Sequence, residues 1–200
     1  MSVTVNVRIG AVGRWQPDSR GRLQEAAFAL FAERGFDQTT AAEIAARAGL
    51  TERTFFRHFA DKREVLFGAS SILEERILAG VSGAPADDGP LDAVACGLEA
   101  AAAMLGEFRR DLSRQRYAVI AANPELRERE LAKLADYAAA VTKALHQRGV
   151  GEPQASLAAE AGMTVLRVAM DRWSSGQDER DLADVMRDSL AGLRAVASGG

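Results

Sequence analysis

The apolar residues in the first third of the chain recur with the spacing of an α-helix. Between residues 19 and 34 they fall three or four positions apart and form one continuous stripe: Leu23, Ala26, Ala27, Leu30 and Phe31. Gly35 follows directly and suits the left-handed conformation that ends a helix. Two shorter apolar patterns come next, and Gly49 separates them. The spacing predicts three successive helices, the last two joined by a tight turn at Gly49.

Capping residues mark where the second and third helices begin. Thr40 followed by Glu43 has the form of a capping box, in which each side chain bonds the other residue's backbone N–H. Thr51 is placed to cap the third helix. Phe55 and Phe59 lie one turn apart on that helix, so we expect both to face the core. The third helix is therefore predicted to begin directly after Thr51.

Helical patterns continue through the rest of the chain. Asp61 and Glu64 repeat the capping box, which predicts a fourth helix from Asp61 with an apolar stripe reaching Ile77. The stretch 82–90 is rich in Gly, Pro and Asp and forms the clearest break. Beyond it, helices are expected near residues 91–108, 112–122, 125–148, 154–174 and 179–197. No convincing strand alternation appears, so we expect an all-α fold of about nine helices.

Composition and charge narrow the class of protein. The 200 residues are 48% apolar and 26% charged, as in ordinary globular proteins. Cys96 is the only cysteine, which excludes an intrachain disulfide. No segment reaches the ~20 apolar residues of a membrane span, and no signal peptide is evident, so we expect a cytoplasmic protein without a membrane partner. The net charge is −3, but residues 1–67 carry +2 and the remainder −5. This asymmetry favours a basic N-terminal module on an acidic body.

The outer face of the third helix has the chemistry of a DNA reader. With Phe55 and Phe59 inward, a rotation of 100° per residue turns Arg53 and Arg57 away from the core. Arginine is the commonest specific reader of guanine, through its paired donors to O6 and N7. Two short helices joined by a glycine turn, with such a second helix, are typical of a helix-turn-helix. An exposed arginine pair also occurs on ordinary solvated helices, so the pattern alone favours DNA binding without excluding that alternative.

The stretch from about Gly21 to Phe67 resembles the TetR family of bacterial transcriptional regulators. The matching segments are AAFALFAERGFDQTT and AAEIAARAGLTERTFFRHFADKREVLF, which align closely and without gaps. The resemblance covers a quarter of the chain by motif. It implies three N-terminal helices that bind DNA and a larger helical bundle that binds a ligand and dimerises. It also implies a homodimer on a palindromic operator in double-stranded DNA, released by a small-molecule effector.

The sequence divides into three expected regions, and the resemblance implies a set of DNA contacts. Arg8, Arg14 and the breaker at Pro17 indicate a basic, flexible arm at residues 1–19. Residues 20–67 are expected to form the helix-turn-helix domain, and residues 68–200 the ligand-binding and dimerisation domain. Thr40, Thr54, His58 and Lys62 then look like phosphate contacts, and Glu52, Arg53, Thr54 and Phe56 occupy positions that face bases. Where the family usually has Tyr, this chain has Phe56, and Arg57 is our candidate to replace the lost hydroxyl. The expected DNA-binding set is Thr40, Thr51, Glu52, Arg53, Thr54, Phe56, Arg57, His58 and Lys62.

The C-terminal body offers two further sets of candidates. Aromatic residues and methionines suit an adaptable apolar pocket, although they also fill ordinary helical cores. The pocket candidates are Met104, Phe108, Tyr117, Tyr137, Met163, Arg167, Met170 and Trp173. An inward-facing Arg116 or Arg167 would favour an anionic ligand. The last two helices are expected to form a four-helix dimer interface. Its candidates are Leu157, Ala161, Val165, Leu182, Val185, Met186, Leu190 and Leu193.

Two other function classes remain to be weighed. The chain has only two histidines, His58 and His146, and lacks a metal-ligand cluster, a G-x-S-x-G motif and a P-loop. We therefore expect no enzyme, no metal and no cofactor. The second alternative is a DNA-binding protein or activator that ignores ligands, which would have a fully packed C-terminal core. For a ligand-responsive regulator, we expect the effector to move the fourth helix and so change the separation of two DNA-reading heads.

Overall fold

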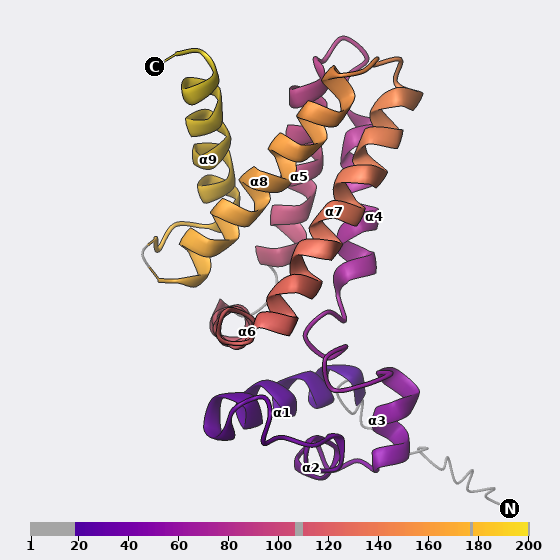
Figure 1. Ribbon diagram of the computed structural model, residues 1–200, viewed down its shortest axis with the longest axis vertical. Coiled ribbons are helices and arrows are strands. Elements are labelled where there is room, and N and C mark those ends of the chain that lie inside the picture. Colours follow the sequence, from indigo (N-terminus) through magenta and orange to yellow (C-terminus); the bar gives the residue numbers. More distant parts are fainter. Residues whose placement is uncertain (1–18, 107–109, 177, 200) are drawn as a thin grey trace, which may run out of the picture.

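The chain folds into helices throughout the part that the computed structural model describes, residues 19–106, 110–176 and 178–199. This confirms the all-α prediction (Figure 1). The helices in these ranges are α1 (Ser19–Arg34), α2 (Ala41–Arg47), α3 (Glu52–His58), α4 (Ser70–Gly83), α5 (Pro90–Gly106), α6 (Arg110–Ala122), α7 (Pro124–Gln147), α8 (Gln154–Ser174) and α9 (Leu182–Ala197). The arm expected at residues 1–19 lies, except for Ser19, outside the described residues.

The helices form a small N-terminal unit and a larger body. In Figure 1, α1, α2 and α3 lie below the body, whose helices α4, α5, α7 and α8 run alongside one another. α9 packs against α5 and α8, and α6 crosses the base of the body beside α1. The core of the small unit also contains Val119, Ile120 and Leu126, which come from α6 and α7. The two units therefore share apolar packing and are not simply tethered.

Local signals position α2 and α3 as the sequence predicted. The Thr40 hydroxyl accepts a hydrogen bond from the Glu43 N–H at 3.2 Å, and the Glu43 carboxylate accepts the Thr40 N–H at 2.9 Å. The Thr51 hydroxyl accepts the N–H of Thr54 at 3.2 Å. Gly49 joins the helices with a φ of 66°, a left-handed conformation that side chains disfavour. The geometry of the helix pair is thus encoded within twenty residues of sequence.

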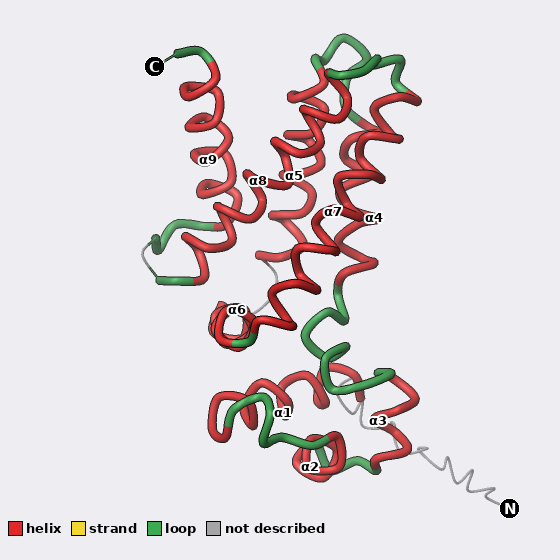
Figure 2. The backbone as a smooth tube through the Cα atoms, viewed as in Figure 1, coloured by secondary structure: helices red, strands yellow, loops and turns green. Residues whose placement is uncertain are grey.

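The predicted start of the fourth helix at Asp61 is wrong. α4 begins at Ser70, and residues 61–69, which we call the junction segment, form a run of turns (Figure 2). The Asp61 carboxylate does accept the N–H groups of Arg63 and Glu64, at 2.7 and 3.0 Å. The capping signal is therefore real, but the following residues make turn hydrogen bonds instead of an α-helix, such as Leu66 N–H to Arg63 O at 3.0 Å.

Tertiary contacts explain why the junction segment leaves the helical path. Three consecutive residues, Val65, Leu66 and Phe67, are all buried in the core of the small unit. Their backbone carbonyls bond side chains from other elements. Gln24 donates to Val65 O at 3.3 Å, and Arg116 Nε donates to Leu66 O at 2.6 Å. Arg20 donates to the carbonyl of Gly68. These donors replace the hydrogen bonds that a helix would supply.

Within the body, α4 and α5 approach closely because glycines meet at their contact. A Cβ atom added to Gly97 would lie 2.8 Å from both the Ile77 carbonyl oxygen and Val81 Cγ2. On the facing helix, a Cβ at Gly80 would lie 2.6 Å from the Cys96 carbonyl oxygen. No real Cβ tolerates such distances, so both positions require glycine for this packing. Residues 84–89 connect these two helices as a loop, and Arg148 donates to the Ala84 and Pro85 carbonyls.

A membrane-spanning role has no support in the described helices, none of which combines the length and apolar character that crossing a bilayer needs.

We predict that Gly97→Ala destabilises the body, since the new methyl group would push α4 away from α5. The expected loss in the free energy of unfolding is about 1–3 kcal/mol, as for other overpacked cores. Gly83→Ala is the matched control because a Cβ there meets no atom within 4 Å, so stability should hold or rise slightly. Chemical denaturation followed by circular dichroism measures both. Equal stability of the two variants would contradict the close packing of α4 on α5.

Candidate DNA-binding surface and effector pocket

The outward face of α3 is free and carries the predicted base-reading residues. Phe55 and Phe59 are buried, while Arg53 and Arg57 are exposed, as the helical rotation predicted. Among the described residues neither arginine has a hydrogen bond or ion pair, so both guanidinium groups are available. Glu52 is exposed beside them, and Phe56 presents 52% of its surface to solvent. The exposed Phe56 ring can make apolar contact with a thymine methyl group in a major groove.

The threonines of the predicted set are committed first to helix caps. Thr40 closes the capping box of α2, and it stays exposed at the start of that helix. The Thr51 and Thr54 hydroxyls lie 2.9 Å apart and share a hydrogen bond at the start of α3. Each hydroxyl can take part in a further hydrogen bond, because it combines one donor with two acceptor lone pairs. Their contact with phosphate stays a prediction.

Lys62 is engaged inside the small unit. Its Nζ donates to the carbonyls of Phe36, Asp37 and Thr39 at 2.8, 3.3 and 3.1 Å, and it lies 4.4 Å from the centre of the Phe36 ring. An ammonium group has three hydrogens, so all are used. His58 is also turned inward in part, since its Nε2 is buried without a hydrogen-bond partner. The geometry thus favours a structural role for Lys62 over the phosphate contact that the sequence suggested.

Ion pairs and carbonyl caps hold α2 against α1. Arg34 pairs with Glu43 at 3.0 Å, and Arg47 makes a two-pronged pair with Glu33 at 2.6 and 2.8 Å. Arg22 donates to the carbonyl of Ala48 at the end of α2. Several basic groups of the small unit are therefore paired within the protein, and among its described residues the unpaired cations lie on α3.

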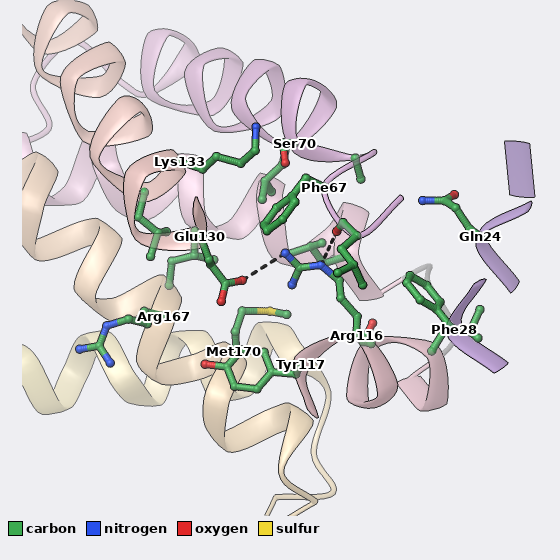
Figure 3. A pocket seen from close by; sticks show the side chains of 18 of the residues that line it. Gln24, Phe28, Phe67, Ser70, Arg116, Tyr117, Glu130, Lys133, Arg167 and Met170 are labelled. Atoms are coloured by element: carbon green, nitrogen blue, oxygen red, sulfur yellow. Dashed lines mark hydrogen bonds and ion pairs between the residues drawn. The ribbon is translucent and has the colours of Figure 1, made fainter. Parts of the chain in front are cut away.

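A cavity of about 360 Å³ lies where the small unit meets the body (Figure 3). Its volume lies in the range of small-molecule sites. The wall is mainly apolar. It is formed by α1, α5, α6, α7 and α8, together with the junction segment and the start of α4. Residues that shape it include Gln24, Phe28, Phe67, Ser70, Arg116, Tyr117, Glu130, Lys133, Tyr137, Arg167 and Met170. A molecule in this cavity would touch α1 directly.

Four of the eight predicted pocket residues line this cavity: Tyr117, Tyr137, Arg167 and Met170. Met163 and Trp173 instead pack in the body core, and Met104 does not line the cavity. Phe108 lies outside the described residues. Core and pocket use the same residue types, so composition could not separate them.

The lining residues that the sequence missed include Phe28, Phe67, Glu130 and Lys133. A signal for two of them existed. Glu130 and Lys133 lie on the same face of α7 as the candidate Tyr137, seven and four residues before it. For α1 and the junction segment no local signal existed, since their approach to the body is a tertiary event.

Polar groups on the cavity wall are mostly tied to the protein itself. Arg116 bonds the Glu130 carboxylate at 3.1 Å while its Nε donates to the Leu66 carbonyl. The Tyr137 hydroxyl donates to Ser70 O at 3.0 Å. Burial raises the pKa of Tyr117 to about 12, with a further contribution from the negative charge of Asp171. Tyr117 is therefore a neutral phenol at physiological pH and can donate a hydrogen bond to a ligand.

The residues expected at the dimer interface fall into two groups. Leu182, Val185, Met186 and Leu190 are buried in the core of their own protomer, because α9 packs its apolar stripe onto α5 and α8. Val165 is buried in the same core, and Leu193 packs against it. Leu157, by contrast, is 66% exposed, and Ala161 is half-buried on the same side of α8. The α9 stripe is thus packed largely within its own chain, and its part in a dimer interface stays a prediction.

Comparison with family models matches both units of the chain. Residues 23–69 match the model described as bacterial regulatory proteins, tetR family. Residues 88–198 match the model described as the MftR C-terminal domain, which alone covers more than half of the chain.

The individual relatives of this chain are also transcriptional regulators. The chain is 38% identical to the HTH-type transcriptional regulator TcmR of Streptomyces glaucescens over 98 residues, 49% of this chain and 39% of TcmR. It is 47% identical to the HTH-type transcriptional repressor KstR2 of Mycobacterium tuberculosis over 47 residues, 24% of each protein. The matches thus span well under two thirds of these relatives. Among solved structures, the repressor FadR of Thermus thermophilus in complex with lauroyl-CoA is 25% identical, with a TM-score of 0.51 over 88% of this chain and 93% of FadR.

We predict that Lys62→Ala lowers the stability of the small unit, because three carbonyls lose their donor. The expected loss is about 1–3 kcal/mol, as for buried groups left without a hydrogen bond. Lys143→Ala, at an exposed position of α7, is the control and should change stability little. Thermal unfolding measures both. An unchanged melting temperature for Lys62→Ala, together with weaker DNA binding at all sequences, would restore the phosphate role.

Proposed function

The chain belongs to the TetR family of bacterial transcriptional regulators, and on that premise we propose that it is a cytoplasmic homodimeric repressor that leaves its palindromic operator when a small molecule binds. Like its relatives, it is a transcriptional regulator and not an enzyme. The observation that carries the proposal is the cavity between the small unit and the body. A ligand there would contact α1 and the junction segment at once, so its binding free energy could shift the position of the reading helix.

The DNA-binding part of the proposal rests on α3. Arg53 and Arg57 are exposed and unpaired among the described residues, and their spacing of four places both guanidinium groups on one helix face. That face has the width to enter a major groove, where arginine reads guanine. The capped starts of α2 and α3 present backbone N–H groups that suit phosphate oxygens.

The dimer part rests on an unpartnered stripe of α8. Leu157, Thr164 and Val168 are exposed at intervals of seven and four residues, and half-buried Ala161 lies between them. This spacing forms one helix face, and its small residues allow another helix to approach closely. Val196 of α9 adds a further exposed apolar side chain. A second copy of the chain presents the same stripe, which suits a two-fold symmetric contact.

Ligand control rests on the cavity and its links to the junction segment. Arg116 and Tyr137 both line the cavity and donate to junction or α4 carbonyls, at Leu66 and Ser70. A ligand that displaces either donor would alter the path between α3 and α4. The related repressor FadR binds lauroyl-CoA, which is a precedent for ligand control in the family. The ligand-blind alternative requires a fully packed body, and a cavity of about 360 Å³ disfavours it.

A gel shift on the intergenic DNA upstream of the chain's own gene tests the proposal as a whole. We expect salt-resistant binding that excess unrelated DNA does not displace and that one member of a ligand panel releases. Specific binding that no ligand disturbs would favour the ligand-blind alternative. A failure to bind this DNA or any other promoter would overturn the DNA-binding assignment.

We predict that Arg53→Ala weakens operator binding by about 1–3 kcal/mol and relaxes sequence preference, because a base contact is lost. Arg53→Lys should recover little, since lysine lacks the planar pair of donors. Arg76→Ala removes an exposed arginine from α4 and is the charge-matched control. Competition gel shifts with mutated operators measure both affinity and preference. Normal operator binding by Arg53→Ala would show that another face of α3 reads the bases.

We predict that Leu157→Glu converts the dimer to monomers, because burying the new carboxylate in the proposed α8 contact would be costly. Leu131→Glu is the matched control: Leu131 is 57% exposed on α7, away from the proposed stripe. Size-exclusion chromatography with light scattering distinguishes the two. A dimer that survives Leu157→Glu and dissociates with Leu131→Glu would move the interface to α7.

A further inference from the structure

The charged residues on the cavity wall differ in whether they have an ion-pair or hydrogen-bond partner. Five of them line it: Glu25, Arg116, Glu130, Lys133 and Arg167. Arg116 and Glu130 neutralise each other through their contact at 3.1 Å, and the Leu66 carbonyl takes a further Arg116 donor. Figure 3 shows this pair at the centre of the wall. Neither member is therefore available to a charged ligand without breaking the pair.

Lys133 differs from Arg116 because no carboxylate pairs with it among the described residues. Its Nζ lies 5.7 Å from the centre of the Phe67 ring, which itself lines the cavity. The acidic neighbours on its own helix are Glu130, already held by Arg116, and Asp136, which does not line the cavity. This half-buried ammonium against an aromatic wall thus has no carboxylate in ion-pair contact among the described residues.

The other charges do not supply that anion. Arg167, on α8, adds a second positive charge, and in Figure 3 its guanidinium extends away from the Arg116–Glu130 pair. Its acidic neighbour Asp171, one turn along α8, is not part of the wall. Glu25, on the α1 side, has an interaction partner of its own. The lining therefore carries an excess of positive charge on its α7 and α8 sides.

The remaining wall specifies an apolar body for the ligand. Phe28, Leu73, Leu134, Leu166 and Met170 supply aliphatic and aromatic surface. The neutral Tyr117 phenol adds a hydrogen-bond donor that matches an oxygen acceptor. Such a wall binds an apolar molecule, and adding an acidic group gives Lys133 the partner it lacks.

We propose that the effector is an organic anion, with an apolar or aromatic body in the cavity and one acidic group at Lys133. This inference rests on the proposed function, since it names the chemical class of the ligand that would release the operator. A neutral or cationic ligand would bury the ammonium further without compensation, which is unfavourable. A carboxylate, a sulfonate and a phosphate ester share the required chemistry.

A matched pair of fluorescent probes tests the proposal on the full chain without DNA. Anilinonaphthalene sulfonate carries an acidic group, and phenylnaphthylamine has the same ring system without it. Titration of each into the protein, followed by fluorescence, gives two dissociation constants. We expect the sulfonate to bind about two- to fivefold more tightly, the range of one ion-pair contact that stays partly exposed to solvent.

Three variants locate the acidic group. Lys133→Gln should remove the preference for the sulfonate and leave phenylnaphthylamine binding unchanged, while Lys133→Arg should keep the preference. Lys143→Gln removes a lysine from an exposed position on the same helix and should change neither constant. Equal binding of the two probes, no binding of either, or a sulfonate preference that survives Lys133→Gln would each overturn the proposal. A loss of preference with Lys143→Gln would do so too, because it would reveal only a general charge effect.

The proposed ligand class and the proposed function can fail independently of each other. Operator binding that a neutral molecule releases would sustain ligand control and overturn the anionic class. Selective sulfonate binding by a chain that ignores all DNA would sustain the pocket chemistry and overturn the regulator's mechanism. Circular dichroism of each variant confirms that the fold is intact before either comparison is made.

Discussion

The arrangement of the whole molecule depends on the hydrogen bonds that side chains make to the backbone of the junction segment. Gln24 of α1 and Arg116 of α6 donate to the neighbouring carbonyls of Val65 and Leu66. Glu64 pairs with Arg129 of α7. Without these partners, buried backbone carbonyls would be left without donors, which is costly. The orientation of the small unit on the body is thus fixed by donors from both, and Gln24 and Arg116 also line the cavity.

Much of the fold follows from short-range signals. The Thr40–Glu43 box, the Thr51 cap and the inward spacing of Phe55 and Phe59 each involve residues within one helical turn. Such contacts form with little help from distant chain, so the pattern predicts them well. The orientation of Arg53 on α3 follows from the same local geometry, which is why the candidate reading face could be identified from sequence.

The features that escaped prediction all depend on distant partners. The capping signal at Asp61 is present, yet buried Val65 to Phe67 and side chains from α1 and α6 override it. The apolar stripe of α9 indicates that its side chains are buried. It does not show that α5 and α8 of the same chain bury them. From the sequence, Lys62 is expected to be an exposed cation. In the fold, carbonyls of the α1–α2 loop surround its ammonium group. In each case the sequence indicates that a side chain is buried or charged, but it does not identify the residue that contacts it.

The shared core of the two units has an evolutionary consequence. Val119, Ile120 and Leu126 belong to the body by sequence but complete the apolar core of the small unit. A recombination event that joined this small unit to a foreign body would expose part of that core unless the new body offered similar side chains at the same places. Under the proposed function, new combinations of operator preference and effector response would therefore arise more readily by point substitutions on α3 and on the cavity wall than by exchange of whole modules.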